Sequence, residues 1–264
     1  MITPVAVITG SSGGIGRDTA ELLFERGYTV FGLSRSKTED SGIIHIYCDL
    51  SDRTSVSEAI NKVVSQTGGI DLLINNAGMG ISGAVEFTEE LDMKNIFDVN
   101  FFGAVHVIKA ALPFLRKSNK GRIINICSVA SDFAIPFQSF YSASKSALLS
   151  LSLSIRNELK PFGIKVAAVL PGDTATGFTD KRKKNHNGDE LYSGRIERSV
   201  SRMEKDEING MPSSFVAKKI VSIASRRRVK PKYVIGFKYI LLSIIVRFLP
   251  VNLYNWIVGL MYSS

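Results

Sequence analysis

Cysteine, histidine and tryptophan are scarce in this sequence. Its 264 residues include two cysteines, three histidines and one tryptophan. Cys48 and Cys127 each lie in an apolar, strand-like run, which indicates buried, reduced thiols in a cytosolic protein rather than a disulfide or a metal pair. The chain opens directly on the strand-like run PVAVITG, so we expect no signal peptide.

The C-terminal segment has no hydrophobic run long enough to cross a bilayer. The longest lies in FKYILLSIIVRFLPVNLYNWIVGLMYSS, where Arg247 and Pro250 cut it well short of about twenty residues. The pattern predicts two short amphipathic helices within 237–262, on either side of Pro250. These helices could lie on a membrane surface, close over a substrate or pack against another subunit. We favour a lid and subunit packing, because the apolar face is interrupted by Tyr254, Asn255 and Trp256.

Acidic residues are scarce in the last third of the chain. Residues 1–180 hold 16 Lys and Arg against 18 Asp and Glu, a net charge of −2. Residues 181–264 hold 17 against 6, a net charge of +11, which gives the chain its overall +9. Such a segment indicates an anionic partner, either a membrane surface or a nucleic acid, or else a solvated charged lid. No interleaving of aromatic and basic residues resembles a nucleic-acid-binding module, so we expect no nucleic acid.

Strand-like and helix-like stretches alternate along the chain. The apolar fraction of 45% is that of a globular protein, and no repeat or low-complexity linker divides the sequence. We expect strands at 5–9, 29–34, 43–48, 71–75, 121–128, 164–171 and 232–236. We expect helices at 15–26, 54–66, 88–99, 101–117, 140–160 and 214–226. The pattern predicts one doubly wound α/β domain over 1–264 with a parallel sheet, and an irregular substrate lid at 173–212.

A glycine-rich turn follows the first strand. The sequence TGSSGGIGR at 9–17 places Gly10, Gly14 and Gly16 where a strand gives way to a helix. Glycines there allow a tight turn and let a phosphate approach the helix N-terminus, where free N–H groups and the helix dipole favour negative charge. The spacing differs from the usual G-x-G-x-x-G fingerprint, but its position after the first strand predicts a dinucleotide site.

The end of the second strand indicates which dinucleotide binds. An NAD site places Asp or Glu there for the ribose hydroxyls, whereas a 2′-phosphate calls for arginine. This chain has Ser34 followed by Arg35, so the pattern favours NADP(H) over NAD, with Ser12 and Arg17 as further phosphate ligands. The alternative is that Arg35 is a solvated loop charge.

Tyr141 and Lys145 lie four residues apart in SFYSASKSALL, among small side chains. Chance on a helix surface is one explanation, and the Ser-x-x-Lys motif of penicillin-binding proteins (Ser142 to Lys145) is another. That motif's companion elements, Ser-Asp-Asn and Lys-Thr-Gly, are missing. On a helix the two side chains are neighbours, about 5–6 Å apart at Cβ. We therefore expect Lys145 to lower the pKa of Tyr141 from about 10, making the phenol a proton donor to a carbonyl oxygen.

In order and spacing these motifs resemble those of the short-chain dehydrogenase/reductase family. The resemblance covers roughly residues 3–180, including NNAG at 75–78, Ser128 thirteen residues before Tyr141, and Pro171-Gly172. Stretches such as NAGMGISGAVEF and the tail KPKYVIG…RFLP look most like the hydroxysteroid and retinol dehydrogenases. The resemblance implies a Rossmann domain that transfers hydride without a metal, and it implies the catalytic residues Asn100, Ser128, Tyr141 and Lys145.

The resemblance also assigns roles. Ser128 would orient the substrate carbonyl, Asn100 would hold a proton-relaying water, and Lys145 would also bind the nicotinamide ribose. The cofactor residues that it implies are Gly10, Ser12, Gly14, Ile15, Gly16, Arg17, Ser34, Arg35, Asp49, Leu50, Asn76, Ala77, Gly78, Tyr141, Lys145, Pro171, Gly172, Thr174 and Thr176. Asp49 also has a structural interpretation as a helix N-cap. Asp173 and Thr174 stand where the family more often has apolar residues, and no catalytic position is matched by His45, His106 or His186.

Apolar residues around the catalytic pair predict a bulky apolar substrate. The expected wall residues are Met79, Phe133, Ile135, Phe137 and Phe178, with core filling as the alternative. We therefore predict an NADP(H)-dependent oxidoreductase that interconverts a ketone or aldehyde and an alcohol on a hydroxysteroid, retinoid or lipid-like molecule. The alternatives are a peripheral membrane-associated lipid ketoreductase and a non-catalytic NADPH-binding protein, which would be expected to lose one of the catalytic residues. We expect a cytoplasmic homodimer or homotetramer, with peripheral membrane contact through the C-terminus left open.

Overall fold

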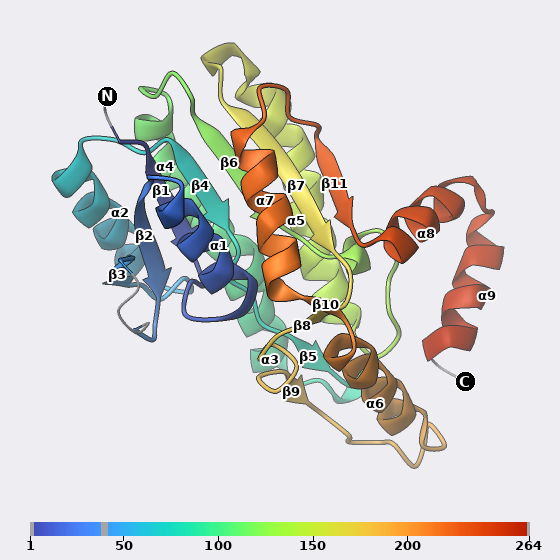
Figure 1. Cartoon of the computed structure of the whole chain (residues 1–264). Helices are drawn as coiled ribbons and strands as arrows, with labels where there is room; N and C mark the ends of the chain where they lie inside the picture. Colours follow the sequence, from blue (N-terminus) through green and yellow to red (C-terminus); the bar gives the residue numbers. More distant parts are fainter. Residues whose placement is uncertain (1–2, 38–41, 263–264) are drawn as a thin grey trace.

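The fold is built on one parallel sheet. The computed structural model describes residues 3–37 and 42–262. Within them the main sheet contains β1 (Val5–Thr9), β2 (Thr29–Ser34), β3 (Ile44–Tyr47), β4 (Leu72–Asn75), β6 (Arg122–Ile126), β7 (Lys165–Pro171) and β11 (Lys232–Ile235). The strands pair in the order β11-β7-β6-β4-β1-β2-β3, all parallel (Figure 1). The predicted doubly wound sheet is confirmed.

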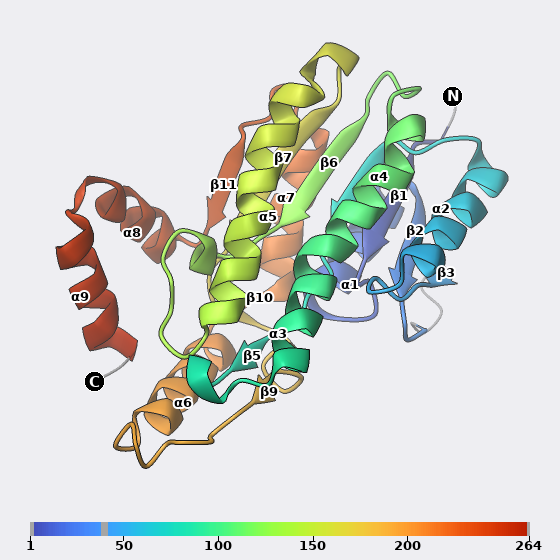
Figure 2. The ribbon, with the colours of Figure 1, turned by 180° about the vertical axis from the view of Figure 1, so that it is seen from behind.

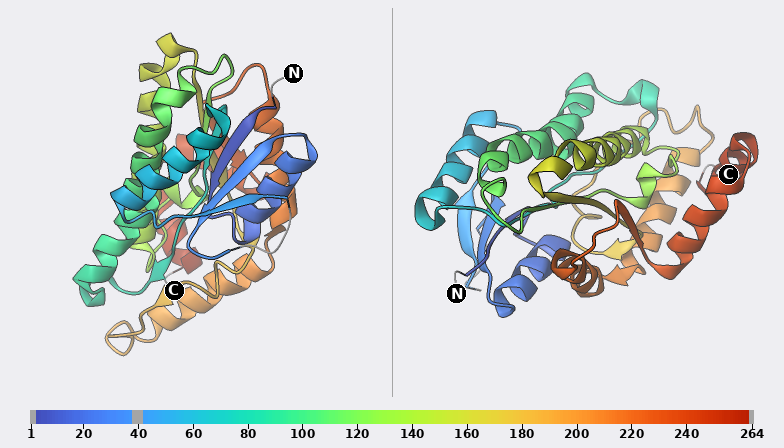
Figure 3. Two further views of the ribbon diagram at one scale, coloured as in Figure 1. Left: turned by 90° about the vertical axis from the view of Figure 1, so that its left-hand side faces the viewer. Right: turned by 90° about the horizontal axis from the view of Figure 1, so that it is seen from above.

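Helices cover both faces of this sheet. On one face lie α2 (Arg53–Thr67), α4 (Gly103–Leu115) and α5 (Ser139–Glu158), and on the other lie α1 (Gly14–Glu25) and α7 (Ser213–Ser225) (Figures 1 and 2). Viewed from above, the strands run between two helical layers (Figure 3). The strands β1, β4 and β7 are buried along nearly their whole length, as expected of a sheet covered on each side.

The strand order reverses between β1 and β4. The chain moves from β1 outward to β3, then returns to β4 on the other side of β1. In open α/β sheets, ligands bind beyond the carboxyl ends of the strands at such a switch point. The fold therefore places the site beside the ends of β1 and β4, where the glycine-rich turn and the sequence NNAG both lie.

The first crossover helices show ordinary capping. Asp52 caps α2 by accepting a hydrogen bond from Thr54 N at 2.8 Å, and Gly68 ends that helix in the left-handed region. The structural interpretation of Asp49 as a helix N-cap is therefore wrong. Its carboxylate instead accepts hydrogen bonds from Ser51 N and Ser51 Oγ.

A long helical segment crosses the back of the site. It comprises α3 (Glu90–Phe97), a π-helical turn at Asp98–Phe102, and α4. Residues 90–115 are long and apolar enough to cross a membrane by length and composition alone. Here α4 packs its apolar side against the sheet through Val107, Ile108, Ala111 and Leu115, so we assign it as a core helix. The π-helical turn carries Asn100, in keeping with the frequent use of such turns at functional sites.

The region expected to be an irregular lid contains ordered structure. It holds α6 (Arg195–Ile208) and the two-residue strands β8 (Thr174–Ala175), β9 (Lys183–Lys184) and β10 (Met211–Pro212). β8 pairs with β10, and β9 pairs with β5 (Ile81–Ser82). Short 3-10 turns occur at Val85–Phe87, Val129–Ser131 and Lys160–Phe162. The expectation of an irregular stretch was wrong, because Ile196, Val200 and Met203 give α6 a buried face.

Two helices extend beyond the edge strand β11. They are α8 (Phe237–Phe248) and α9 (Val251–Tyr262), separated by Leu249 and Pro250 as the sequence predicted. Figures 1 and 2 show α8 leaving the end of β11 and α9 running back toward α6. Tyr239 and Val258 are buried against the body of the protein and attach the two helices to it.

Candidate functional site

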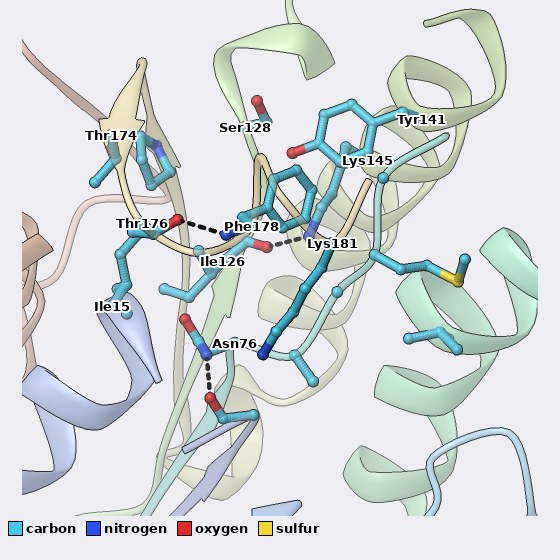
Figure 4. Close-up of a pocket in the computed structure, with 18 of the residues that line it drawn as sticks. Ile15, Asn76, Ile126, Ser128, Tyr141, Lys145, Thr174, Thr176, Phe178 and Lys181 are labelled. Atoms are coloured by element: carbon cyan, nitrogen blue, oxygen red, sulfur yellow. Dashed lines mark hydrogen bonds between the residues drawn. The ribbon is translucent and has the colours of Figure 1, made fainter. Parts of the chain in front are cut away.

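A cavity of about 680 Å³ lies at the carboxyl ends of the sheet strands. It begins at the glycine-rich turn, passes Ser128, Tyr141 and Lys145, and ends under the lid and the tip of α9. Figure 4 shows its central part, where the Tyr141 hydroxyl is directed toward Ser128 and the Lys145 side chain lies beside the tyrosine ring. One continuous space therefore joins the expected cofactor residues to the expected catalytic residues.

Three glycines of the glycine-rich turn, Gly10, Gly14 and Gly16, are closely packed against their neighbours. Gly10 has a φ of +67°, and a Cβ there would lie 2.8 Å from Ala77 Cα. Gly14 has a φ of +52° and faces Thr176. A Cβ on Gly16 would lie 2.2 Å from Gly10 O, so this glycine serves close packing of the turn and does not line the cavity.

Polar contacts join this turn to the end of β4. Thr9 Oγ1 accepts hydrogen bonds from the backbone N–H groups of Asn76 and Ala77, each at 3.0 Å. Asn76 Nδ2 donates to Thr9 O and to Gly10 O. The ends of β1 and β4 are thus fixed to each other. This leaves the N-terminus of α1 facing the cavity, the geometry that a dinucleotide phosphate requires.

The far end of the cavity carries the residues expected at the adenine side. Ser34, Arg35, Asp49 and Leu50 all line it. Hydrogen bonds from Ser51 hold the pKa of Asp49 below its usual value, with a smaller contribution from the Arg35 charge. Arg35 is exposed at this end of the cavity.

Arg17 does not lie in the cavity. Its Nε donates to Glu21 Oε1 at 2.8 Å, one turn further along α1. Arg17 therefore does not line the site as the sequence predicted. The i,i+4 spacing of Arg17 and Glu21 was the sequence signal that could have shown this.

Tyr141 stands on the first turns of α5, beside the end of β6. Burial raises its pKa to about 12, while a hydrogen bond with Ser128 acts in the opposite direction. The negative charge of Glu207 also raises this pKa, and the positive charge of Arg182 lowers it. At neutral pH the phenol is protonated, and it can donate a proton.

Lys145 does not act on Tyr141 in the way the sequence argument expected. Its Nζ donates to Ile126 O at 3.0 Å, and burial lowers the pKa of this lysine. The expected lowering of the Tyr141 pKa is wrong for this structure, because burial of the phenol outweighs the favourable contacts. A Cβ placed on Gly78 would lie 3.1 Å from Lys145 Nζ, so the absence of a side chain there leaves room for the ammonium.

Asn100 lies behind the cavity and does not line it. Its Oδ1 accepts a hydrogen bond from Met79 N at 2.8 Å, and its Nδ2 donates to Met79 O and to Ser144 Oγ. The side chain thus holds the cavity wall at Met79 against α5. Its proton-relay role stays a prediction of the resemblance.

A second chain of hydrogen bonds fixes α5 to the sheet. Asn75 Nδ2 donates to Asn125 Oδ1 at 2.9 Å, and Asn125 Nδ2 donates to Ser152 Oγ at 2.8 Å. All three side chains are buried. These hydrogen bonds link β4, β6 and α5 in the interior, where a broken hydrogen bond is most costly. They therefore fix the position of α5, and of Tyr141 on it, relative to the strands.

The segment after β7 closes the cofactor side. Pro171, Gly172, Thr174 and Thr176 line the cavity, and Thr176 Oγ1 accepts a hydrogen bond from Phe178 N (Figure 4). Asp173, which departs from the family pattern, has a clear partner. It accepts a hydrogen bond from the hydroxyl of Tyr239 on α8, so this departure attaches the C-terminal helices to the site.

Three of the five expected substrate residues line the cavity, namely Met79, Ile135 and Phe178. The ring of Phe178 lies 5.8 Å from that of Tyr141. Phe133 and Phe137 are buried in hydrophobic clusters instead and do not line the cavity. For these two the expectation was wrong, because the loop turns at Phe137, whose φ is +58°, and directs its ring toward Tyr192.

Sequence reasoning found Thr174, Thr176 and Phe178 of the lid but missed the other cavity residues that the lid and tail supply. Met203 and Glu207 of α6, Lys181 of the lid and Tyr262 of α9 all line the cavity. Figure 4 shows the Lys181 side chain extending into it. These residues belong to no motif. The one available signal was the helical spacing of Ile196, Val200 and Met203, which would have placed one face of α6 inward.

Glu207 is held in place by two lid side chains. It forms an ion pair with the buried Arg182, and it accepts a hydrogen bond from Thr179 Oγ1 at 2.7 Å. The guanidinium of Arg182 also lies over the ring of Phe178, 5.8 Å from its centre. The Glu207 carboxylate is therefore held in place at the wall of the cavity.

Comparison with known proteins agrees with this geometry. The family model described as short chain dehydrogenase matches residues 4–187. A 3-ketodihydrosphingosine reductase of Bacteroides thetaiotaomicron is 38% identical over 263 residues, which cover 98% of each chain. A solved short-chain dehydrogenase from Streptomyces avermitilis has a TM-score of 0.82 at 27% identity, covering 96% of each chain. ElxO, solved with NADP bound, has a TM-score of 0.73 at 26% identity, covering 91% of this chain and all of the other.

The matched segment contains the glycine-rich turn, the switch point and the Ser128–Tyr141–Lys145 group, and the sheet order is that of the matched fold. The fold binds a nicotinamide cofactor, and the residues present fit one, since the glycines leave a cradle that a Cβ would fill. The chain belongs to the short-chain dehydrogenase/reductase family and is an oxidoreductase of that type.

Proposed function

We propose that this protein reduces a ketone on a bulky, lipid-like substrate with NADPH, and catalyses the reverse alcohol oxidation. The observation that carries the proposal is the protonated phenol of Tyr141, which shares one cavity with Ser128, Lys145 and several apolar side chains. Bound NADPH would supply the hydride. Tyr141 would donate the proton to the carbonyl oxygen, Ser128 would orient that oxygen, and Lys145 would bind the nicotinamide ribose.

The proton donor is tested by Tyr141→Phe. We expect kcat for ketone reduction to fall by about 10²–10⁴-fold, the usual effect of losing a general acid, with little change in the Kd for NADPH. Tyr47→Phe is the matched control, because Tyr47 is exposed on β3 and lies outside the cavity. Turnover within a few-fold of the unsubstituted enzyme would exclude Tyr141 as the donor.

We further propose NADP(H) as the preferred cofactor. Support comes from Arg35 at the adenine end of the cavity and from the absence of a carboxylate at Ser34, where an NAD site would place one. Arg35→Ala should weaken NADPH binding much more than NADH binding, and Ser34→Asp should extend the change by repelling the 2′-phosphate. Lys37→Ala, an exposed basic residue two positions away, should leave the ratio unchanged. A preference of the unsubstituted enzyme for NADH would contradict this proposal.

For the substrate we propose a long-chain ketone with an amino group near the carbonyl. The Bacteroides relative, named for a keto form of an amino-alcohol lipid, supports this class. So does Glu207, whose carboxylate lines the cavity and raises the pKa of Tyr141. In addition to its ion pair with Arg182, this carboxylate would stabilise an ammonium group beside the ketone, while Met79, Ile135 and Phe178 would accept the apolar chain. A steroid or retinoid substrate stays a prediction of the family resemblance.

A substrate panel tests this class. NADPH consumption is measured with a 2-amino-3-keto lipid, the same ketone without the amino group, ketosteroids and retinal. We expect the aminoketone to have the highest kcat/KM, and Glu207→Gln to remove most of its advantage over the deaminated ketone. Asp206→Asn, the adjacent residue outside this cavity, should preserve the advantage. Equal kcat/KM for the two ketones in the unsubstituted enzyme would contradict the role given to Glu207.

We propose that the protein acts as a cytoplasmic homodimer or homotetramer, as the family resemblance implies. Sedimentation velocity of the full chain measures this directly. A monomer at micromolar concentration, with full activity, would contradict it.

A further inference from the structure

The C-terminal helices have two different faces. The inner face contacts the body of the protein: Tyr239 and Val258 are buried, and Tyr254 Oη accepts a hydrogen bond from Ala134 N at 3.1 Å. The outer face is apolar and exposed. On it lie Phe237, Ile240, Leu241, Ile244, Ile245, Phe248, Val251, Leu253, Trp256 and Leu260. We call these ten residues the outer apolar face.

The exposed apolar residues of α8 recur at helical spacing. On α8 they recur at intervals of three and four, from Phe237 through Ile244 to Phe248, which is one stripe of a helix. Phe237 is 85% exposed and Phe248 is 80% exposed. Monomeric soluble proteins rarely expose a contiguous apolar patch of this kind unless it binds something.

The structure weakens the sequence argument against membrane binding at two of its three residues, while Asn255 is exposed. It held that Tyr254, Asn255 and Trp256 interrupt the apolar face. Tyr254 points inward to Ala134, whereas Trp256 is 61% exposed and lies on the outer face with Leu253 and Leu260. An exposed tryptophan among aliphatic side chains is typical of helices that lie in a membrane interface.

The positive charge of the C-terminal part of the chain favours an anionic partner. Residues 208–264 contain nine Lys and Arg and no Asp or Glu. Lys238 lies on α8 itself, and the basic loop at 226–230 precedes β11. A symmetric contact between two copies would bring like charges together, which is unfavourable. An anionic lipid surface is complementary in charge and accepts the apolar side chains as well.

The same helices contact the catalytic cavity. Tyr262 at the end of α9 lines the cavity, and Tyr239 on α8 bonds Asp173, which also lines it. The outer apolar face therefore lies on the side of these helices away from the cavity.

We propose that the outer apolar face of α8 and α9 docks this enzyme on the surface of an anionic bilayer. The helices would lie in the interface with their apolar side chains among the lipid headgroups and upper acyl chains. The docking itself does not depend on the substrate proposed above.

Trp256 gives a direct test, because it is the single tryptophan of the chain. Full-length protein is mixed with phosphatidylcholine vesicles, with and without phosphatidylglycerol, and both vesicle flotation and tryptophan emission are recorded. We expect flotation and a blue shift of the emission with the anionic vesicles, weaker binding to phosphatidylcholine alone, and partial release by added salt. Absence of binding to anionic vesicles would overturn the proposal.

Two variants separate docking from self-association. Leu241→Asp with Ile244→Asp should reduce vesicle binding by about tenfold or more, because two aliphatic contacts are lost and negative charge is added. Phe162→Asp is the control: Phe162 is 52% exposed and lies outside the outer apolar face. NADPH binding confirms that each variant is folded. A blue shift that appears without vesicles as protein concentration rises would assign this face to a second copy and overturn the proposal.

Discussion

Replacing Lys145 by methionine should stabilise the protein while abolishing its activity. Lys145 is 4% exposed, and its burial lowers its pKa, so the charged form is less favourable in the folded protein than in water. Methionine keeps a long apolar stem and removes the ammonium. A residue proposed for catalysis would thus be retained at the expense of stability, as is common at active sites.

Two opposing free-energy contributions set the stability change in Lys145→Met. Removing the ammonium relieves a desolvation cost on the order of several kcal/mol. It also removes the hydrogen bond from Lys145 Nζ to Ile126 O at 3.0 Å. A bond to a charged donor contributes about 1.5–3 kcal/mol. The balance favours the variant by about 1–3 kcal/mol, or about 2–10 °C in Tm for a chain of this size.

The pH dependence of the stability difference between Lys145→Met and the parent tests whether the variant is stabilised. Because the folded-state pKa is depressed, the penalty is fully present below that pKa and disappears as pH rises toward the unfolded value of about 10.4. Thermal unfolding without added cofactor should therefore show a larger advantage for Lys145→Met at about pH 7 than at about pH 10.5. Lys109→Met, at an exposed position on α4, should show no such advantage. A variant less stable than the parent at neutral pH would refute the reasoning.

Other positions give equally direct tests. Gly16→Ala should abolish NADPH binding in calorimetric titration, because its Cβ would lie 2.2 Å from Gly10 O. Gly13→Ala adds a Cβ in open space and should bind NADPH normally. Equal affinities of the two variants for NADPH would contradict the packing argument. Alcohol oxidation should accelerate as pH rises toward the Tyr141 pKa of about 12, because the base is the phenolate, while ketone reduction stays nearly constant around neutrality. A flat oxidation profile would count against Tyr141. Tyr262→Ala should raise KM for long ketones more than for short ones, and equal changes would remove α9 from the substrate site.

The main sheet could be predicted from sequence because its strands are buried on both faces. Runs such as VAVIT at 5–9 and KVAAVLP at 165–171 are apolar at every position or nearly so, and each is bounded by a turn. The expected ranges agree with the observed strands to within two residues at each end. Glycines such as Gly10 could also be recognised from sequence, because the local backbone conformation and packing there require a residue without a side chain.

The rest depends on contacts that sequence spacing does not encode. Phe133 and Phe137 lie at the same spacing as Ile135, yet only Ile135 lines the cavity, because a positive φ at Phe137 redirects the loop. Glu207 enters the cavity only once α6 has packed. Arg17 lies beside the cofactor turn but is held by Glu21. In each case a tertiary contact or a local competitor decided the outcome.

The hydrogen-bond chain from Asn75 through Asn125 to Ser152 divides the site into a fixed part and an exchangeable part. It ties α5, and with it Tyr141 and Lys145, to the centre of the sheet. Some of the residues that would select a substrate, Met203, Glu207 and Tyr262, come instead from α6 and the tip of α9, which lie outside that network. Substitutions in the lid can therefore alter which molecules enter without moving the proton donor. A lineage with this architecture can acquire new substrates while inheriting its chemistry unchanged.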